Sequence, residues 1–419
     1  MSPVEDGSAY AVVDGLFRRE SAHLVAALTR LLGPSHLALA EDVVHDALIG
    51  AMQAWRFGLP DDPKAWILRV AKNRAIDCLR RERRLEALDD THLAGRSLEG
   101  AVELALSSEA DAANQLAMMF AICDDALSPE THVTLILRFL CGLSPSEIAR
   151  AFLVDVGTID RRLHRGRTRL EQLGALHDAS ADEVRARQPS VEQALYLLFN
   201  EGYLGSDPEN PLQPAMCADA LRLVEVLLAS NPLEHARVNA LAALFCFDAA
   251  RLPGRLDDTG VLTPLAEQDR AKWSRVLVDR GIVHLGESAS GDLLTRWHLE
   301  AGIAFEHTRA QSFEETNWGK IVDYYDALLA LTPGPVVALN RALALAELRG
   351  VDAGRAALAL LDGHPKLTTY SFYWAALADL ARRGGLLAEA KNMYARASAL
   401  AKSRAERVSY ERRILRLGE

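Results

Sequence analysis

Basic residues gather in two short stretches of a chain that is acidic overall. Residues 157–170 hold five arginines against one acidic residue, and residues 64–84 hold eight basic residues against two acidic ones, while the 419-residue chain has a net charge of −10. Guanidinium and ammonium groups at this density bind the phosphates of a polyanion, and guanidinium groups also bind guanine edges. The spacing therefore predicts two local contacts with nucleic acid.

The later stretch carries the pattern of a helix–turn–helix. Ser144 is a predicted N-cap, Pro145 takes the first helical position, Glu147 completes a capping box, and Asp155 is a predicted N-cap of a second helix. At 100° per residue, the second helix has one apolar stripe of Ile159, Leu163, Gly166 and Leu170. Its polar residues point elsewhere and suit a major groove: Thr158, Arg161, Arg162, Arg165 and Arg169. The alternative is an ordinary helix pair with a solvated arginine face.

The earlier stretch predicts a basic helix after a Pro-bounded loop. One face holds small and apolar residues, namely Ile67, Ala71, Ala75 and Cys78. The other face holds Arg69, Lys72, Asn73, Arg80 and Arg83, which suits a phosphate backbone. Trp66 is either a stacking partner for a displaced base or a core residue, and its place in the run of residues 65–68 favours the core.

An acidic helix is predicted one element before the basic helix. Val43, Val44, Ala47 and Leu48 are expected to face inward, and Asp42, His45 and Asp46 outward. Alone, this pattern is typical of a solvated helix face. Its position ahead of the basic helix favours a functional role.

Taken in order, these motifs resemble the two defining regions of sigma-70 family factors in their minimal, extracytoplasmic-function (ECF) form. The acidic helix resembles the part of region 2 that binds the clamp helices of the largest RNA polymerase subunit. The resemblance implies a core-polymerase-binding set of Glu41, Asp42, His45 and Asp46, with His45 standing where a glutamine is usual.

The two basic helices resemble the promoter-reading parts of the same family. Residues 63–77 are similar to the segment of region 2 that melts and reads the −10 element, which implies the set Lys64, Arg69, Lys72, Asn73, Arg80 and Arg83. Residues 143–167 are similar to region 4, which reads the −35 element, and imply the set Thr158, Arg161, Arg162, Arg165, Arg167 and Arg169. Asp160 stands where the family often has Lys or Arg.

The C-terminal half predicts a stack of helical repeats. Tetratricopeptide spacing is found in Trp374, Leu377, Ala378, Gly385, Ala390, Tyr394 and Ala397. Residues 196–203 and 335–341 resemble the ECF subgroup with a fused tetratricopeptide-like (TPR-like) C-terminal domain, which is thought to regulate the factor. Such a stack offers a curved surface for a peptide, another protein or the chain's own sigma domains, or it is purely structural. Glu201 and Tyr203 are candidates for docking onto the sigma domains.

The predicted fold is all-α: two small helical sigma domains (a region 2 bundle and a region 4 helix–turn–helix) and a C-terminal TPR-like α-solenoid. The expected boundaries are residues 10–84 for region 2, 85–110 for a linker, 111–173 for region 4, 174–190 for a connector and 191–419 for the repeat domain.

Other function classes have little support in the sequence. The five cysteines form no CxxC pair and the twelve histidines form no metal-spaced cluster, so we expect reduced thiols, no metal, no cofactor and no enzyme. No apolar run is long enough for a membrane span, and we expect a cytoplasmic protein whose partners are core RNA polymerase and promoter DNA. The alternatives are a helix–turn–helix activator with a TPR-like sensor domain, which would not need residues 40–84, and an enzyme.

Overall fold

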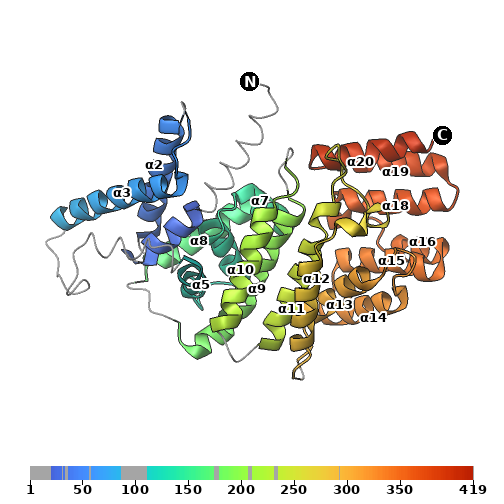
Figure 1. The fold of residues 1–419 in the computed structure, drawn as a ribbon, viewed down its shortest axis with the longest axis horizontal. Helices are drawn as coiled ribbons and strands as arrows, with labels where there is room; N and C mark the ends of the chain where they lie inside the picture. Colours follow the sequence, from blue (N-terminus) through green and yellow to red (C-terminus); the bar gives the residue numbers. More distant parts are fainter. Residues whose placement is uncertain are drawn as a thin grey trace. The chain divides into compact units, whose positions relative to one another are not determined.

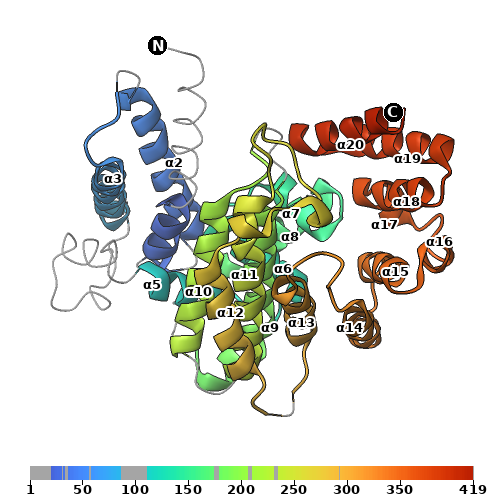
Figure 2. The same ribbon diagram turned by 45° about the vertical axis from the view of Figure 1, so that its right-hand side comes forward.

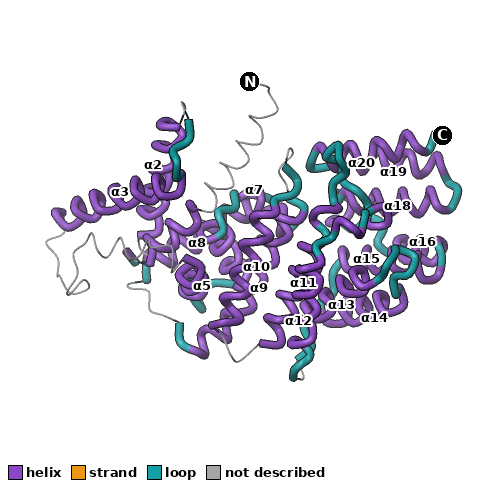
Figure 3. The backbone as a smooth tube through the Cα atoms, in the orientation of Figure 1, coloured by secondary structure: helices purple, strands orange, loops and turns teal. Residues whose placement is uncertain are grey.

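In the computed structural model of the chain, the described residues are almost all helical. They are residues 20–30, 32–33, 36–55, 58–85, 111–173, 179–205, 210–230, 235–291 and 293–418. Within these ranges there is no strand, and one isolated bridge joins Leu256 to Leu262 (Figure 3). The all-α prediction is confirmed. The predicted linker of residues 85–110 lies outside the described residues, apart from Leu85.

The chain divides into two compact units, Met1–Leu198 and Phe199–Glu419, coloured blue to green and green to red in Figure 1. The first unit begins with a helical segment over residues 20–30, followed by α2 (Leu37–Ala54) and α3 (Pro63–Leu85). The helices α2 and α3 pack against each other because each has a small apolar face. Val43, Val44 and Ala47 are buried on α2, as are Ile67, Ala71 and Ala75 on α3.

The second bundle of the first unit contains the helix–turn–helix. Its elements are α5 (Asp111–Ala121), α6 (Pro129–Leu135), the π-helical turn η5 (Ile136–Leu140), α7 (Pro145–Phe152) and α8 (Val156–Glu171). The predicted caps are present: Ser144 and Glu147 form a capping box, and Asp155 accepts a hydrogen bond from the Thr158 N–H. The turn between α7 and α8 passes through Leu153 at φ 54°, a left-handed conformation that non-glycine residues rarely adopt.

The depth of α8 in this bundle depends on one glycine. The buried residues of α8 are Ile159, Leu163, Gly166 and Leu170, which is the predicted stripe. A Cβ on Gly166 would lie 2.5 Å from Cδ2 of Leu135, so no larger residue fits while α8 packs this closely on α6.

The helix α9 (Ala181–Tyr203) starts ten residues before the helical region predicted from residue 191. Ser180 and Glu183 cap its first turn by reciprocal hydrogen bonds, and Pro189 is accommodated inside the helix. The predicted connector of residues 174–190 is therefore largely helix. Polar composition is typical of a connector, but here the polar side chains of Gln188 and Glu192 are fully buried and hydrogen-bonded to each other.

The second unit is a succession of helices in which sequence neighbours pack together. They are α10 (Pro214–Ser230), α11 (His235–Ala250), α12 (Arg275–Ser288), α13 (Arg296–Arg309), α14 (Trp318–Leu331), α15 (Pro335–Arg349), α16 (Val351–Ala359), α17 (Pro365–Thr368), α18 (Ser371–Arg383), α19 (Leu387–Leu400) and α20 (Arg404–Arg416). Figures 1 and 2 show α18, α19 and α20 lying side by side. The predicted repeat residues Ala378, Ala390, Tyr394 and Ala397 are fully buried between them, as a repeat stack requires.

Residues 251–274 interrupt this helical stack. They contain three single 3₁₀ turns: Leu252–Gly254, Leu265–Glu267 and Arg270–Lys272. The C-terminal helix α20 holds the segment in place, because Ser409 donates a hydrogen bond to the Leu262 carbonyl and Arg412 forms an ion pair of 2.7 Å with Asp257. We call residues 251–274 the inserted segment.

Candidate nucleic-acid interface

The predicted DNA-binding residues of α8 fall into two physically different groups. Arg161 and Arg165 are exposed, and half-exposed Thr158 lies beside Arg161, which donates a 2.8 Å hydrogen bond to its hydroxyl. Thr158 also donates a hydrogen bond to Asp155, whose pKa is lowered mainly by that hydroxyl. Thr158 and Arg161 lie in the first two turns of α8, where a groove-reading helix makes its base contacts, and Arg165 lies one turn further on; the acidic Asp160 is exposed beside them.

The other three predicted residues of α8 are engaged within the protein. Arg162 lies over the Phe152 ring at 5.0 Å and so braces α8 against α7. Arg169 makes a two-fold hydrogen bond with Asp124, with distances of 2.7 and 3.0 Å, and this contact is the main reason that the Asp124 pKa is lowered. Arg167 donates a 2.7 Å hydrogen bond to Glu41 on α2.

Glu41 was predicted to bind polymerase, yet it faces the helix–turn–helix. Its carboxylate lies 2.7 Å from Arg167 and 3.6 Å from Arg138. Burial raises the Glu41 pKa, against the opposing effect of the two arginines. Arg138 was absent from the sequence-based set, because no local pattern reveals a pair between residues so far apart in the chain.

The rest of the acidic helix remains available. Asp42, His45 and Asp46 are exposed on α2, and Asp46 accepts a 2.8 Å hydrogen bond from Arg74 of α3. Arg74 was also missing from the predicted set. A surface ion pair of this kind contributes little to stability, so it can exchange for a partner's basic group.

The basic helix α3 presents part of its predicted set to solvent. Arg69 and Asn73 are exposed, Lys72 is half-buried, and Lys64 lies 3.5 Å from the buried carboxylate of Glu20. The side chains of Arg80 and Arg83 lie outside the described residues. Trp66 is half-buried and packs edge-to-face with Trp55, with ring centroids 5.5 Å apart, so its ring is only partly enclosed in the bundle.

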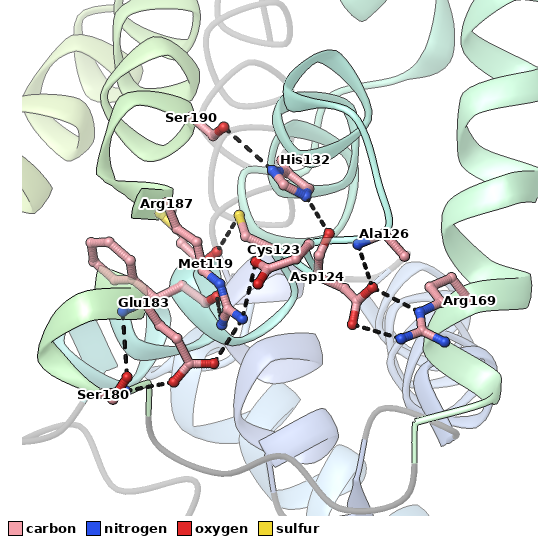
Figure 4. A network of polar contacts seen from close by, with 12 residues as sticks. Met119, Cys123, Asp124, Ala126, His132, Arg169, Ser180, Glu183, Arg187 and Ser190 are labelled. Carbon is pink, nitrogen blue, oxygen red and sulfur yellow. Dashed lines mark hydrogen bonds and ion pairs between the residues drawn. The ribbon is translucent and has the colours of Figure 1, made fainter. Parts of the chain in front are cut away.

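A polar network joins the helix–turn–helix bundle to the first half of α9 (Figure 4). Arg187 donates to the Phe120 carbonyl at the end of α5 and pairs with Glu183 at 2.8 Å and Asp125 at 3.6 Å. His132 bridges the Asp124 carbonyl, at 2.8 Å, and the Ser190 hydroxyl, at 3.4 Å. We call these contacts the α9 seam.

The groups beside the α9 seam are held neutral. Burial lowers the pKa of His132, and burial raises the pKa of the Cys123 thiol to about 12. A neutral imidazole and a protonated thiol fit a permanent packing contact, and they give no sign of a nucleophile.

Comparison with known proteins identifies the two bundles. The family model "Sigma-70 region 2" matches residues 16–85, and "Sigma-70, region 4" matches residues 125–170. The ECF RNA polymerase sigma factor SigE of Mycolicibacterium smegmatis is 28% identical over 177 residues, which are 42% of this chain and 66% of that protein. The chain belongs to the ECF type of the sigma-70 family.

The C-terminal region of this sigma factor is additional to those two regions. A family of unknown function (DUF6596) matches residues 187–289. An uncharacterized protein, R00370, of Rhizobium meliloti (strain 1021) is 33% identical over 377 residues, or 88% of each chain, so the two share the extension as well as the sigma regions. No solved structure matches the chain.

Both matched sigma regions are transcription regulators by family rather than enzymes. Among the described residues, no cluster of three or more His, Cys, Asp or Glu side chains is arranged to hold a metal ion. Nor does any helix in those ranges have the length and apolar character needed to cross a bilayer.

Proposed function

We propose that this sigma factor binds core RNA polymerase in the cytoplasm through the exposed face of α2 and directs it to promoters through α3 and α8. The observation that carries the proposal is the pairing of an exposed acidic face on α2 with an exposed arginine face on α8 in one chain. The first suits a basic protein surface, and the second suits the major groove at the −35 element.

The −35 contact is proposed to be made by Thr158, Arg161 and Arg165. The remaining three arginines of the predicted set would position α8, because Arg162, Arg167 and Arg169 already contact Phe152, Glu41 and Asp124. This division limits the proposed base-reading surface of α8 to residues 158–165.

Promoter binding is proposed to require separation of region 2 from region 4. The Glu41 pair with Arg138 and Arg167 holds α2 beside α8, whereas elements centred about 25 base pairs apart are separated by about 85 Å at 3.4 Å per base pair. The chain from Leu85 to Asp111 has 26 residue steps by subtraction of these numbers, which at full extension reaches about 86–94 Å. The chain between Leu85 and Asp111 is therefore long enough for region 2 and region 4 to bind the two promoter elements at once, after the contacts of Glu41 with Arg138 and Arg167 have broken.

The extension is proposed to regulate the factor, with intramolecular docking as one route. The support is the continuity of α9, which makes the seam with region 4 in its first half and continues to Tyr203 as one helix. A change in the extension is therefore proposed to reach region 4 along this helix.

In vitro transcription with core polymerase tests these proposals. Full-length protein should give promoter-dependent transcripts, and removal of the chain after Leu198 should change their yield while keeping the α9 seam intact. A second truncation after Leu173 removes the seam as well and separates its effect from that of the repeats. If both truncations gave the same transcript yield as the full-length protein, a regulatory extension would be contradicted. Circular dichroism checks that the protein truncated after Leu198 is folded. If it is not, Arg187→Ala, which weakens the α9 seam in the full chain, replaces it as the test protein.

A further inference from the structure

The inserted segment gathers arginines and aromatic rings in the interior of the second unit. Arg251 and Arg270 lie over the Trp273 ring, with guanidinium carbons 5.6 and 4.7 Å from its centroid. The guanidinium carbon of Arg255 lies 3.8 Å from the centroid of the Tyr203 ring, so this ring already has a partner within the extension. Long ordered segments between helices commonly carry function, since packing alone does not require them.

Several side chains of this cluster have buried polar atoms without a hydrogen-bond partner among the described residues. They are Tyr203 Oη, Arg251 Nε, Arg255 Nε, Arg270 Nη2, Trp273 Nε1 and His307 Nδ1. Trp273 and His307 are each only 9% exposed. An unpaired buried polar group costs about 1–3 kcal/mol, so a group of them within one cluster calls for a bound ion or molecule.

Few of the described acidic groups have contacts with these arginines, and Asp248 acts on both Arg251 and Arg255. Asp248 lies 3.6 Å from Arg251 and is the near counter-charge. Of the other acids, Glu300 is paired with Arg296 at 2.8 Å, and Glu306 faces Arg309 at 3.4 Å and Lys320 at 3.8 Å. Glu314 acts on Arg270 as a distant charge.

The local pKa values report the same excess of positive charge. The Arg270 pKa is lowered by burial and by the charge of Arg251. Burial, with the charges of Arg251 and Arg270, lowers the His307 pKa to about 3, so the imidazole is neutral and can donate one hydrogen bond without adding charge. Water could satisfy the donors, but it would not offset the repulsion between the guanidinium groups.

The cluster is rigid and reachable. Arg270 is fixed by hydrogen bonds to the carbonyls of His307 and Ala310, at 2.5 and 2.8 Å. Arg251, Arg255 and Arg270 remain partly exposed, which gives a small ion a route to them. A Cβ on Gly254 would lie 3.1 Å from Trp273 Nε1, so only a glycine lets the backbone approach the indole N–H this closely.

We propose that Arg251, Arg270, Trp273 and His307 form a binding site for one small oxyanion, a carboxylate or a phosphate group, inside the extension. Guanidinium groups bind both oxyanions by charge-assisted hydrogen bonds, and the indole and imidazole N–H groups add neutral donors. The site would give the extension a chemical input of its own. The proposal rests only on the geometry of the second unit, so it does not depend on whether the chain initiates transcription.

Isothermal titration and thermal unfolding of the full chain test the site. The probes are sodium phosphate and sodium succinate, each against sodium chloride at equal ionic strength. Phosphate or succinate should bind saturably at one site per chain and raise Tm, and comparison of the two identifies the preferred oxyanion. Saturable binding by neither probe would overturn the proposal.

Two variants and two controls locate the binding. Arg251→Gln removes one charge, and Gly254→Ala places a methyl group 3.1 Å from Trp273 Nε1 without changing any charge. Each should weaken binding at least ten-fold. Arg396→Gln, which removes an exposed arginine over Trp374, should bind as wild type, and so should Arg161→Ala/Arg165→Ala on α8. Wild-type affinity in both Arg251→Gln and Gly254→Ala, with folding verified by circular dichroism, would refute the assignment.

Discussion

Arginine serves region 4 and the extension in different ways. On α8, Arg161 and Arg165 stand in solvent on a helix whose opposite face is buried, so their charge is available to an extended polyanion. In the extension, Arg251 and Arg270 are packed against the Trp273 ring and make contacts within the protein, so their charge is not available to an extended polyanion. Exposure, rather than residue type, thus decides which partner an arginine can take.

The strongest way to break this comparison is to remove the exposed arginines. In Arg161→Ala/Arg165→Ala, affinity for a −35-containing promoter should fall at least about 100-fold, because each well-formed base contact contributes about 1–3 kcal/mol. Because two positive charges leave the interface, the slope of log affinity against log salt concentration should also become less steep by about two. Arg185→Ala, another exposed arginine, is the matched control, and promoter binding by holoenzyme measured across a salt series gives both quantities. An unchanged affinity would show that α8 does not read DNA.

The second test alters the packing that sets the depth of α8. Gly166→Ala should lower the free energy of unfolding by about 1–3 kcal/mol, because the added methyl group overlaps Leu135. Gly286→Ala is the control: a Cβ there meets nothing within 4 Å, so the better helix propensity of alanine should leave stability equal or higher. Urea denaturation measures the free energy of unfolding of both variants. If Gly166→Ala did not lower it, α8 would not pack against Leu135 as described.

The third test concerns the acidic side of the first unit. Asp42→Ala/Asp46→Ala should weaken binding to core polymerase by about ten-fold, since two exposed carboxylates would lose basic partners across an interface. Binding of isolated chain to promoter DNA should not fall, because both residues lie off α8. Fluorescence anisotropy measures the affinity for core polymerase with labelled core and the affinity for promoter DNA with labelled DNA. Equal losses in both assays would point to misfolding rather than to a polymerase contact.

Much of the first unit could be predicted from sequence, because its signals are local. The caps at Ser144 and Asp155 and the buried stripe of α8 follow from residues within a few positions of one another. The pairs of Glu41 with Arg167 and of Asp124 with Arg169 join residues 126 and 45 positions apart, which no local pattern encodes. The early start of α9 was missed because its first residues are polar and mostly exposed, as in a connecting segment. The arginine cluster was missed because only the fold brings Arg251, Arg270 and His307 together.

The smallest predicted effect comes from releasing Arg169, which would change an arginine paired within the protein into an exposed one. Asp124→Asn weakens the pair that holds Arg169, which should lower the free energy of unfolding at neutral pH by about 1 kcal/mol. The Asp124 pKa is lowered in the folded protein, so its stabilisation is present above the ordinary aspartate pKa of about 3.9 and is lost as pH falls through the lower folded value.

Wild type and Asp124→Asn should therefore converge in stability as pH falls below about 4. Denaturation followed by circular dichroism from pH 7 downward measures this difference. A constant gap at every pH would mean that the carboxylate charge of Asp124 does not contribute to stability.

The most direct test is initiation by core polymerase on a library of genomic promoter fragments, with the full chain added as the sole sigma factor. The wild-type chain should select a subset of fragments that share a −35 and a −10 sequence. The Asp42→Ala/Asp46→Ala variant should form less holoenzyme at limiting concentration but select the same sequences, and Arg161→Ala/Arg165→Ala should assemble but select no −35 sequence. Transcripts that do not depend on the folded chain, or identical selection by all three proteins, would contradict the account.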